Sequence, residues 1–126
     1  MKENVRFYVC PICGNIVGLI SGEANRVKCC GVPMEVMVAN TTDASVEKHV
    51  PIYEIEGEEI IVRVGEVIHP MEDAHYITFI TLVTNDRVIR VDLKPGDEPV
   101  VRLPYVSGSV IYEYCNLHGL WKNEVK

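Results

Sequence analysis

Four of the five cysteines in this chain of 126 residues lie near the N-terminus, in the stretches Cys10-Pro-Ile-Cys13-Gly and Cys29-Cys30-Gly. A C-x-x-C-G turn directs backbone N–H groups toward the first thiolates, and a second pair later in the chain completes a tetrahedral site of four sulfurs. Zinc and mononuclear iron both fit such a site. Because about 36 residues bury too little apolar surface to fold alone, we expect the metal to supply much of this segment's folding free energy.

The adjacent pair Cys29 and Cys30 distinguishes this segment from an ordinary zinc ribbon, in which the second pair also has the spacing C-x-x-C. Two neighbouring ligands on one metal require an unusual backbone conformation. The tight pair with its flanking glycines resembles desulforedoxin, a small iron protein with a Fe(Cys)4 centre, and the resemblance covers the whole segment. A structural zinc ribbon is the competing interpretation.

The composition of the chain is that of a soluble globular protein, with 48% hydrophobic and 24% charged residues. No apolar run approaches the roughly 20 residues needed to cross a bilayer, so no membrane partner is expected. The N-terminus lacks the basic and apolar regions of a secretory signal, which predicts a cytoplasmic protein whose cysteines bind metal rather than form disulfides. A net charge of -6 without a cluster of Lys and Arg argues against a nucleic-acid partner.

The positions of the cysteines and histidines predict two domains, residues 1–38 and residues 39–126. The first domain contains four cysteines and no histidine, whereas the second contains all four histidines and the fifth cysteine, Cys115. Between them the stretch MVANTTDASVEKH changes from apolar to polar, turn-favouring residues, which suits a linker and a loop. We therefore place the boundary near Ala39.

The second domain shows the patterns of β-strands. Residues 59–65 and 87–93 alternate between apolar and polar side chains, as half-buried strands do, and residues 75–84 are apolar on both faces, as in a central strand. The stretches TND and KPGDEP are turn signals, and VVRL and SVIYEYC are further strands. No stretch shows sustained helical periodicity. We predict an antiparallel β-sandwich of about seven short strands.

Four histidines and Cys115 form a second set of candidate ligands. Each histidine lies in a segment expected to be a strand edge or a loop, where a scaffold can present side chains to one point. Neutral imidazoles suit Fe(II), and a thiolate donates electron density to the metal. Zinc normally stops at four ligands, so a set of five favours iron with an open sixth position. The histidines are His49, His69, His75 and His118.

These stretches together carry a specific resemblance. EKHVP, HPM followed by HY, and CNLHG followed by Trp121, all behind a desulforedoxin-like segment, resemble the desulfoferrodoxin family of two-iron superoxide reductases. The resemblance spans essentially the whole chain in the right order, and every cysteine and histidine falls on a ligand position.

The resemblance implies two iron centres, and the residues that hold them follow position by position. The ligands of centre I, a Fe(Cys)4 site, would be Cys10, Cys13, Cys29 and Cys30. Centre II, a Fe(His)4(Cys) site, would have Cys115 as its axial thiolate and four equatorial histidines, namely His49, His69, His75 and His118. Glu47 matches the carboxylate that occupies the sixth position of the oxidised iron, and Lys48 matches the cation beside the open site.

The resemblance also implies an activity, a fold and partners. The activity is the one-electron reduction of superoxide to hydrogen peroxide at an open Fe(II) site, with rubredoxin or a similar small protein as the electron donor. The larger domain would be an immunoglobulin-like sandwich, and the chain would form a homodimer. From composition alone, Glu47 and Lys48 would be a solvated charge pair. Glu72 and Asp73 are interpreted as surface acids.

Three other interpretations compete with a superoxide reductase. A zinc ribbon attached to an immunoglobulin-like interaction domain explains the first four cysteines but leaves the second set as coincidence. A nucleophilic enzyme could use Cys115 and His118 with Asn116 as the orienting group, although it ignores the other three histidines. A plain electron carrier would have no use for an open coordination position.

Overall fold

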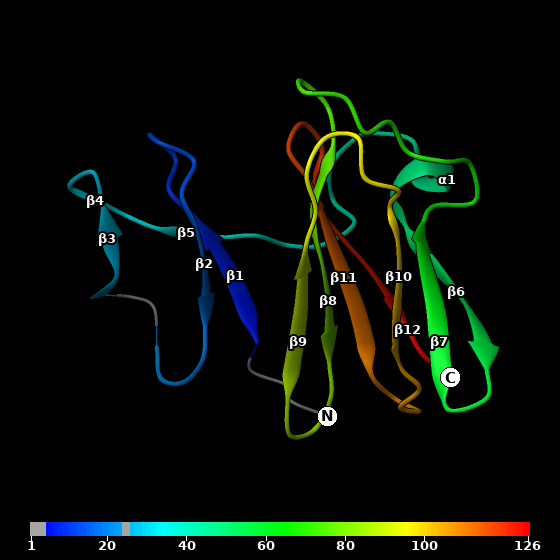
Figure 1. The fold of residues 1–126 in the computed structure, drawn as a ribbon. Helices are drawn as coiled ribbons and strands as arrows, with labels where there is room; N and C mark the ends of the chain where they lie inside the picture. The colour runs from blue at the N-terminus through cyan, green and yellow to red at the C-terminus, as the bar shows by residue number, and fades with distance from the viewer. Residues whose placement is uncertain (1–4, 24–25) are drawn as a thin grey trace. The chain divides into compact units, whose positions relative to one another are not determined.

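The computed structural model of the chain describes residues 5–23 and 26–126. Residues 1–4, at the start of the first predicted domain, lie outside the described part. The chain divides into a smaller unit that ends at Val38 and a larger unit that begins at Ala39. Almost all regular structure in the described residues is β-strand (Figure 1), so the predicted mainly β fold is confirmed.

The smaller unit is built from two short sheets. The first has the strand order β2-β1-β5 and the second pairs β3 with β4. Its buried residues are few and centre on Tyr8, Cys10 and Met34. The strands are β1 (Arg6–Val9), β2 (Ile16–Leu19), β3 (Lys28–Cys29), β4 (Val32–Pro33) and β5 (Glu35–Val36).

The larger unit is a sandwich of two antiparallel sheets with the orders β10-β7-β6 and β12-β11-β8-β9. Side chains from both sheets meet in one buried apolar core. The seven strands described in residues 39–126 match the number that the sequence predicts. They are β6 (Pro51–Glu56), β7 (Glu59–Val64), β8 (Ile77–Val83), β9 (Val88–Asp92), β10 (Val100–Pro104), β11 (Val110–Cys115) and β12 (Gly119–Glu124).

The hydrophobic pattern of the strands agrees with their burial. Ile60, Val62 and Val64, which alternate with polar residues along β7, are fully buried. Strand β8 is buried along both faces and lies inside its sheet between β11 and β9, as its uniformly apolar sequence predicts. The strands β6 and β12 were not predicted, because their burial follows no clean alternation.

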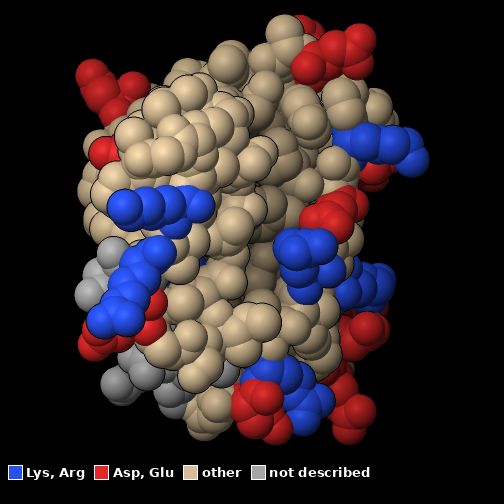
Figure 2. Space-filling model, turned by 90° about the vertical axis from the view of Figure 1, so that its left-hand side faces the viewer, with Lys and Arg blue, Asp and Glu red and all other residues tan. Residues whose placement is uncertain are grey.

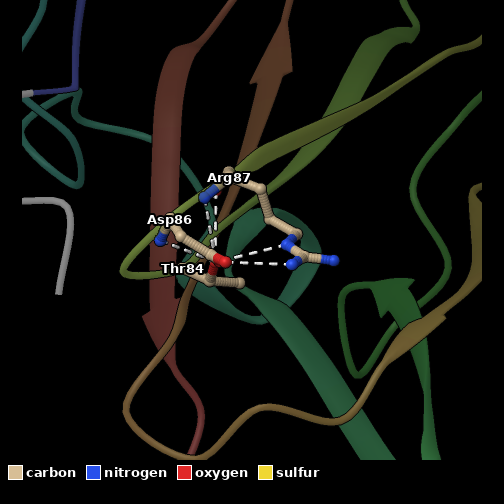
Figure 3. A network of polar contacts seen from close by, with 3 residues as sticks. All are labelled: Thr84, Asp86 and Arg87. Atoms are coloured by element: carbon tan, nitrogen blue, oxygen red, sulfur yellow. Dashed lines mark hydrogen bonds and ion pairs between the residues drawn. The ribbon is translucent and has the colours of Figure 1, made fainter.

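The TND stretch forms the predicted hairpin between β8 and β9, and Figure 3 shows the side chains that hold it. The Thr84 hydroxyl accepts the backbone N–H groups of Asp86 and Arg87 at 3.3 and 3.2 Å. The Arg87 guanidinium donates to both carboxylate oxygens of Asp86 at 3.0 and 2.9 Å, which lowers the pKa of Asp86 to about 2. These local bonds fix the turn and the register of the two strands.

The sequence prediction is wrong over one short segment. The stretch around His49 was expected to be a strand edge or loop, but it contains a single helical turn, α1 (Val46–His49), closed by the N–H of Val50 donating to the carbonyl of Val46 at 2.9 Å. A four-residue helix is too short to produce a 3.6-residue hydrophobic period. No helix in the described residues is long and apolar enough to span a membrane.

Three connections of the larger unit lie together at one end of the sandwich (Figure 1). They are the segment with α1, the loop between β7 and β8, and the tight turn between β11 and β12. These connections contain or border all four histidines and Cys115.

Candidate metal centres

The four cysteines of the smaller unit lie in two turns. Cys10 and Cys13 occupy the turn between β1 and β2, and Cys29 and Cys30 lie where β3 turns into β4. The sulfurs are all within 4.8 Å of one another, although the two cysteines of each pair differ in exposure. The structure therefore brings together the four residues that the sequence predicts for centre I.

The backbone of the second turn has an unusual conformation that lets two adjacent cysteines face the same site. Cys30 has a φ of 53°, in the left-handed region that side chains other than glycine rarely adopt, and Gly31 follows with a φ of 76°. This conformation turns two consecutive thiols toward one point. The unusual backbone expected for adjacent ligands is confirmed, and strain of this kind is typical of functional sites.

The pKa shifts of two of these thiols, Cys10 and Cys30, fit a metal site. The N–H groups of Cys13 and Ile12 lower the pKa of the Cys10 thiol to about 6, and the Cys13 N–H lies 3.4 Å from that sulfur. In contrast, hydrogen bonds to Cys13 and Cys10 raise the pKa of Cys30 to about 12. Without metal the cluster therefore holds protons that a bound cation would displace.

The second set of ligands comes from four parts of the larger unit. His49 ends α1, His69 and His75 lie in the loop between β7 and β8, and Cys115 and His118 lie at the end of β11 and in the following turn. Their candidate ligand atoms are also within 4.8 Å of one another. The five residues predicted for centre II are thus brought to one point.

The four imidazole rings are arranged close to a square. Rings that are neighbours around the square, in the order His49, His69, His75, His118, have centroids 4.6 to 5.0 Å apart and meet edge to face at 74 to 89°. The His49 to His75 distance of 6.4 Å is longer than every side, as a diagonal must be. Four nitrogens around one centre form the equatorial plane that an octahedral or square-pyramidal metal requires.

The hydrogen bonds of two histidines determine which nitrogen faces the centre. Nδ1 of His49 lies 2.7 Å from the carbonyl oxygen of Ser45, and Nδ1 of His69 lies 2.6 Å from that of Pro70. A carbonyl only accepts, so both Nδ1 atoms carry the proton and both Nε2 atoms present a lone pair. These two Nε2 atoms are 3.1 Å apart and cannot hydrogen-bond to each other. Two facing lone pairs at this distance fit a shared cation.

The remaining groups of the cluster agree with this assignment. Nε2 of His75 is buried without a hydrogen-bond partner, and Nδ1 of His118 points at Nε2 of His49 from 3.0 Å. Burial lowers the pKa of His49 and His75 and lowers that of His69 to about 4. These three imidazoles are therefore neutral near pH 7, the form that binds metal.

Cys115 approaches the square from the core of the sandwich. It is fully buried and belongs to the main apolar cluster, and burial raises the pKa of its thiol. The pairing of β11 with β8 shifts register between Tyr114 and Cys115, a bulge that bends the strand end beside the site. His75 and His118 are only half-buried. The site therefore has a closed side with the thiol and a side nearer to solvent.

Glu47 and Lys48 lie on α1 directly before His49, and both are exposed. Burial is the main cause of the lowered pKa of His49 and His75, neighbouring histidines come next, and the positive charge of Lys48 is the smallest of the lowering causes. The acids Glu72 and Asp73 are exposed, as predicted.

Sequence reasoning missed the groups that support the ligands. Trp121 stacks on His49 with centroids 5.0 Å apart, and its Nε1 donates to the His118 carbonyl at 3.0 Å. The Ser45 and Pro70 carbonyls, which orient His49 and His69, carry no signal in the sequence because every residue has a carbonyl. Trp121, the single tryptophan, was the one signal in the sequence, because it closely follows CNLHG.

Asn116 does not serve the nucleophilic enzyme considered as an alternative. Its Oδ1 accepts the N–H of Tyr76 at 2.9 Å, and its Nδ2 donates to the carbonyl of Ala74 at 3.1 Å. The side chain thus ties the loop around His75 to β11. Cys115 Sγ and His118 Nδ1 are 3.9 Å apart, longer than the hydrogen bond of an activated thiol pair.

Charged residues of opposite sign are mixed on the surface that Figure 2 shows. Lys and Arg side chains lie next to Asp and Glu side chains at several places on this face, and large areas between them carry neither. Among the described residues of this face there is no continuous basic surface of the kind that tracks a phosphate backbone.

Comparisons with known proteins agree with the two clusters. A family model described as Desulfoferrodoxin matches residues 41–124. A desulfoferrodoxin of Syntrophotalea carbinolica is 47% identical over 98% of this chain and 99% of that protein. A desulfoferrodoxin homolog of Archaeoglobus fulgidus is 45% identical, with 98% and 99% coverage. The crystal structure of the superoxide reductase from Treponema pallidum has a TM-score of 0.76 and 29% identity, covering 97% of this chain and 100% of that chain.

A small four-cysteine unit followed by a β-sandwich with a four-histidine, one-cysteine cluster defines a class of protein with two mononuclear metal sites. Together with the similarity over nearly the whole chain, this site places the protein in one family of that class. The chain belongs to the desulfoferrodoxin family. Its two clusters are able to bind two iron ions.

Proposed function

We propose that this protein is a superoxide reductase, which converts superoxide, one electron and two protons into hydrogen peroxide. The observation that carries the proposal is the square of four imidazoles with a buried thiol on one side and half-buried histidines toward solvent. The relatives that share this chain's length are desulfoferrodoxins, and the similar solved structure is a superoxide reductase.

The proposed ligands divide into two centres. Centre I is held by Cys10, Cys13, Cys29 and Cys30. Centre II would be held by Cys115 and by the four histidines His49, His69, His75 and His118. Iron bound at centre II supplies a one-electron reductant with a position open to a small anion.

The burial of Cys115 means that substrate would reach centre II from the opposite, more exposed side. Cys115 lies in the apolar core, so a small anion would reach the histidine cluster from the side nearer to solvent. As a thiolate, Cys115 would donate electron density to the iron that it helps to hold. The solvent on that side can supply the two protons that the product needs.

Lys48 provides a local positive potential in a chain whose formal net charge is -6. Superoxide is an anion, and the Lys48 charge that lowers the pKa of His49 and His75 also attracts an anion approaching the same point. We assign Glu47, its neighbour on α1, as the carboxylate that occupies the substrate position after oxidation.

Four further features of the family are proposals for this chain. Rubredoxin or a similar small protein would return the electron, directly or through centre I. The chain would form a homodimer and work in the cytoplasm, and its sandwich would have the immunoglobulin-like topology. The antiparallel two-sheet architecture supports the last of these.

The proposed activity is tested on protein purified and loaded with Fe(II) without oxygen. We expect two irons per chain, and we expect one hydrogen peroxide for each superoxide consumed while a reductant is present. A dismutase would give one hydrogen peroxide for every two superoxide ions. The measurements are metal analysis, visible absorption and peroxide yield after superoxide generation.

The Cys115→Ser variant is the matched test of centre II. We expect it to lose the sulfur-to-iron absorption band of centre II and the activity, while the bands of centre I are unchanged. Iron at both sites with no superoxide consumption, or a dismutase yield of peroxide, would refute the proposed function.

A further inference from the structure

Gly65 is one of two glycines without the positive φ that favours glycine. Seven of the nine glycines have φ values between 65 and 91°, in the region that favours glycine. Gly65 and Gly18 do not have a positive φ of this kind. At both positions φ imposes no penalty on an alanine, so the space available to its Cβ becomes important.

The space at Gly65 is closed by the backbone of α1. A Cβ atom there would lie 2.5 Å from the carbonyl oxygen of Glu47 and 2.8 Å from the carbonyl carbon of Lys48. Real Cβ atoms do not approach other heavy atoms within 3.0 Å. The neighbours are backbone atoms, so they cannot rotate away as a side chain can. A Cβ would have to push the helical turn and the end of β7 apart.

The same contact contains a hydrogen bond. The N–H of Val67 donates to the carbonyl of Glu47 at 3.1 Å, so the segment 65–67 lies directly against α1. The turn has only four residues and carries Glu47, Lys48 and His49 in succession. Because α1 is only one turn long, it has no further turns that could absorb a shift of the Glu47 carbonyl. A shift there would therefore move His49 as well.

His49 has little tolerance for displacement. Its Nε2 lies 3.1 Å from Nε2 of His69 and 3.0 Å from Nδ1 of His118, and its ring stacks on Trp121. Moving α1 by the few tenths of an ångström to one ångström that a methyl group demands would open one corner of the histidine square.

We propose that Gly65 is a positioning residue for centre II: its missing side chain lets the segment 65–67 hold α1 where His49 completes the square and Lys48 lies beside it. The inference rests on the proposed function only for the identity of the metal, because the contact concerns the geometry of the ligand set.

The test is Gly65→Ala in the full-length chain, compared with Gly18→Ala. Gly18 also has an ordinary φ, but a Cβ there meets no atom closer than Phe7 Cε1 at 4.0 Å. We expect Gly65→Ala to keep the bands of centre I and to bind Fe(II) at centre II roughly 10- to 100-fold more weakly, with a shifted centre II absorption band. Gly18→Ala should match the wild type at centre II.

A second variant covers the case in which Gly65→Ala does not fold, as judged by circular dichroism. Val67→Pro keeps Gly65, changes an exposed side chain and removes the N–H that bonds to Glu47, while its ring also restricts the backbone at residues 66 and 67. It should weaken Fe(II) binding at centre II in the same direction. Wild-type affinity and an unchanged centre II band in the folded variant, whichever of the two it is, would overturn the proposal.

These outcomes are separate from those of the proposed function. If the wild type binds Fe(II) at both centres but does not reduce superoxide, the function fails while the role of Gly65 is still decided by metal affinity. If Gly65→Ala binds Fe(II) normally and the wild type is an active reductase, only the role of Gly65 fails.

Discussion

Lys48 is the residue that we propose attracts the anionic substrate. It is exposed on α1, and its charge helps to lower the pKa of His49 and His75. An exposed charge acts over about 10 Å or less at ordinary salt, so its effect on an anion must weaken as salt increases. The role of Lys48 can therefore be read from the salt dependence of the rate.

We expect Lys48→Ala to lower the second-order rate of superoxide reduction roughly two- to tenfold at low ionic strength, with the difference shrinking at high salt. Pulse radiolysis over a range of salt concentrations measures it. The matched control is Lys122→Ala, which removes the same charge from the exposed face of β12. A Lys48→Ala variant with an unchanged rate and unchanged salt dependence would remove the electrostatic role of this residue.

The loop between β7 and β8 is held in place by a residue at the end of β11. It contributes His69 and His75, and its last residues are tied to β11 by Asn116, which bonds to Tyr76 and Ala74. The sequence identified Asn116 only as a partner for a catalytic pair. Its structural role depends on the loop folding back beside β11, which no local pattern encodes.

We expect Asn116→Ala to lower the free energy of unfolding of the larger unit by about 1–3 kcal/mol, because two side-chain hydrogen bonds are lost. The loosened loop should also weaken iron binding at centre II while centre I is unchanged. Urea unfolding and the centre II absorption band measure the two effects. Asn85→Ala, in the exposed turn between β8 and β9, is the control. Equal behaviour of the two variants would contradict this role of Asn116.

At the scale of elements, the sequence predicted those strands whose burial alternates or is uniform. Strand β7 and strand β8 are of these two kinds. The strands β6 and β12 lie at the sheet edges, and their burial depends on what covers them. Hydrogen bonds such as Asn123 to the Pro51 carbonyl at 3.0 Å join these two edges. Such contacts between distant segments are not visible in local periodicity.

The whole molecule consists of two units with different sources of stability. The buried residues of the smaller unit centre on Tyr8, Cys10 and Met34, whereas the larger unit has a continuous apolar core from both of its sheets. Burial of apolar area stabilises a fold roughly in proportion to the area, so the smaller unit lacks the main source of stability. We therefore expect metal binding to contribute much of its folding free energy.

We expect loss of the metal at centre I to unfold the smaller unit and leave the larger unit folded. The test is Cys30→Ser, which removes a ligand of centre I, compared with His118→Ala, which removes a ligand of centre II. Limited proteolysis should cut Cys30→Ser within residues 5–38 and leave the sandwich intact, whereas His118→Ala should resist cleavage in both units. Equal protection of the smaller unit in the two variants would show that its fold does not need the metal.

The sequence by itself determined the kinds of ligand, their order and the strands with clear alternation, because side-chain chemistry and period-two burial are local properties. The tertiary structure alone decided that the ligand atoms meet, for His49 and His118 are 69 positions apart and contact each other at 3.0 Å. It also decided which nitrogen each histidine offers, since the Ser45 and Pro70 carbonyls hold the protons of His49 and His69. Convergence and tautomer depend on packing between distant segments, and packing exists only in the folded chain.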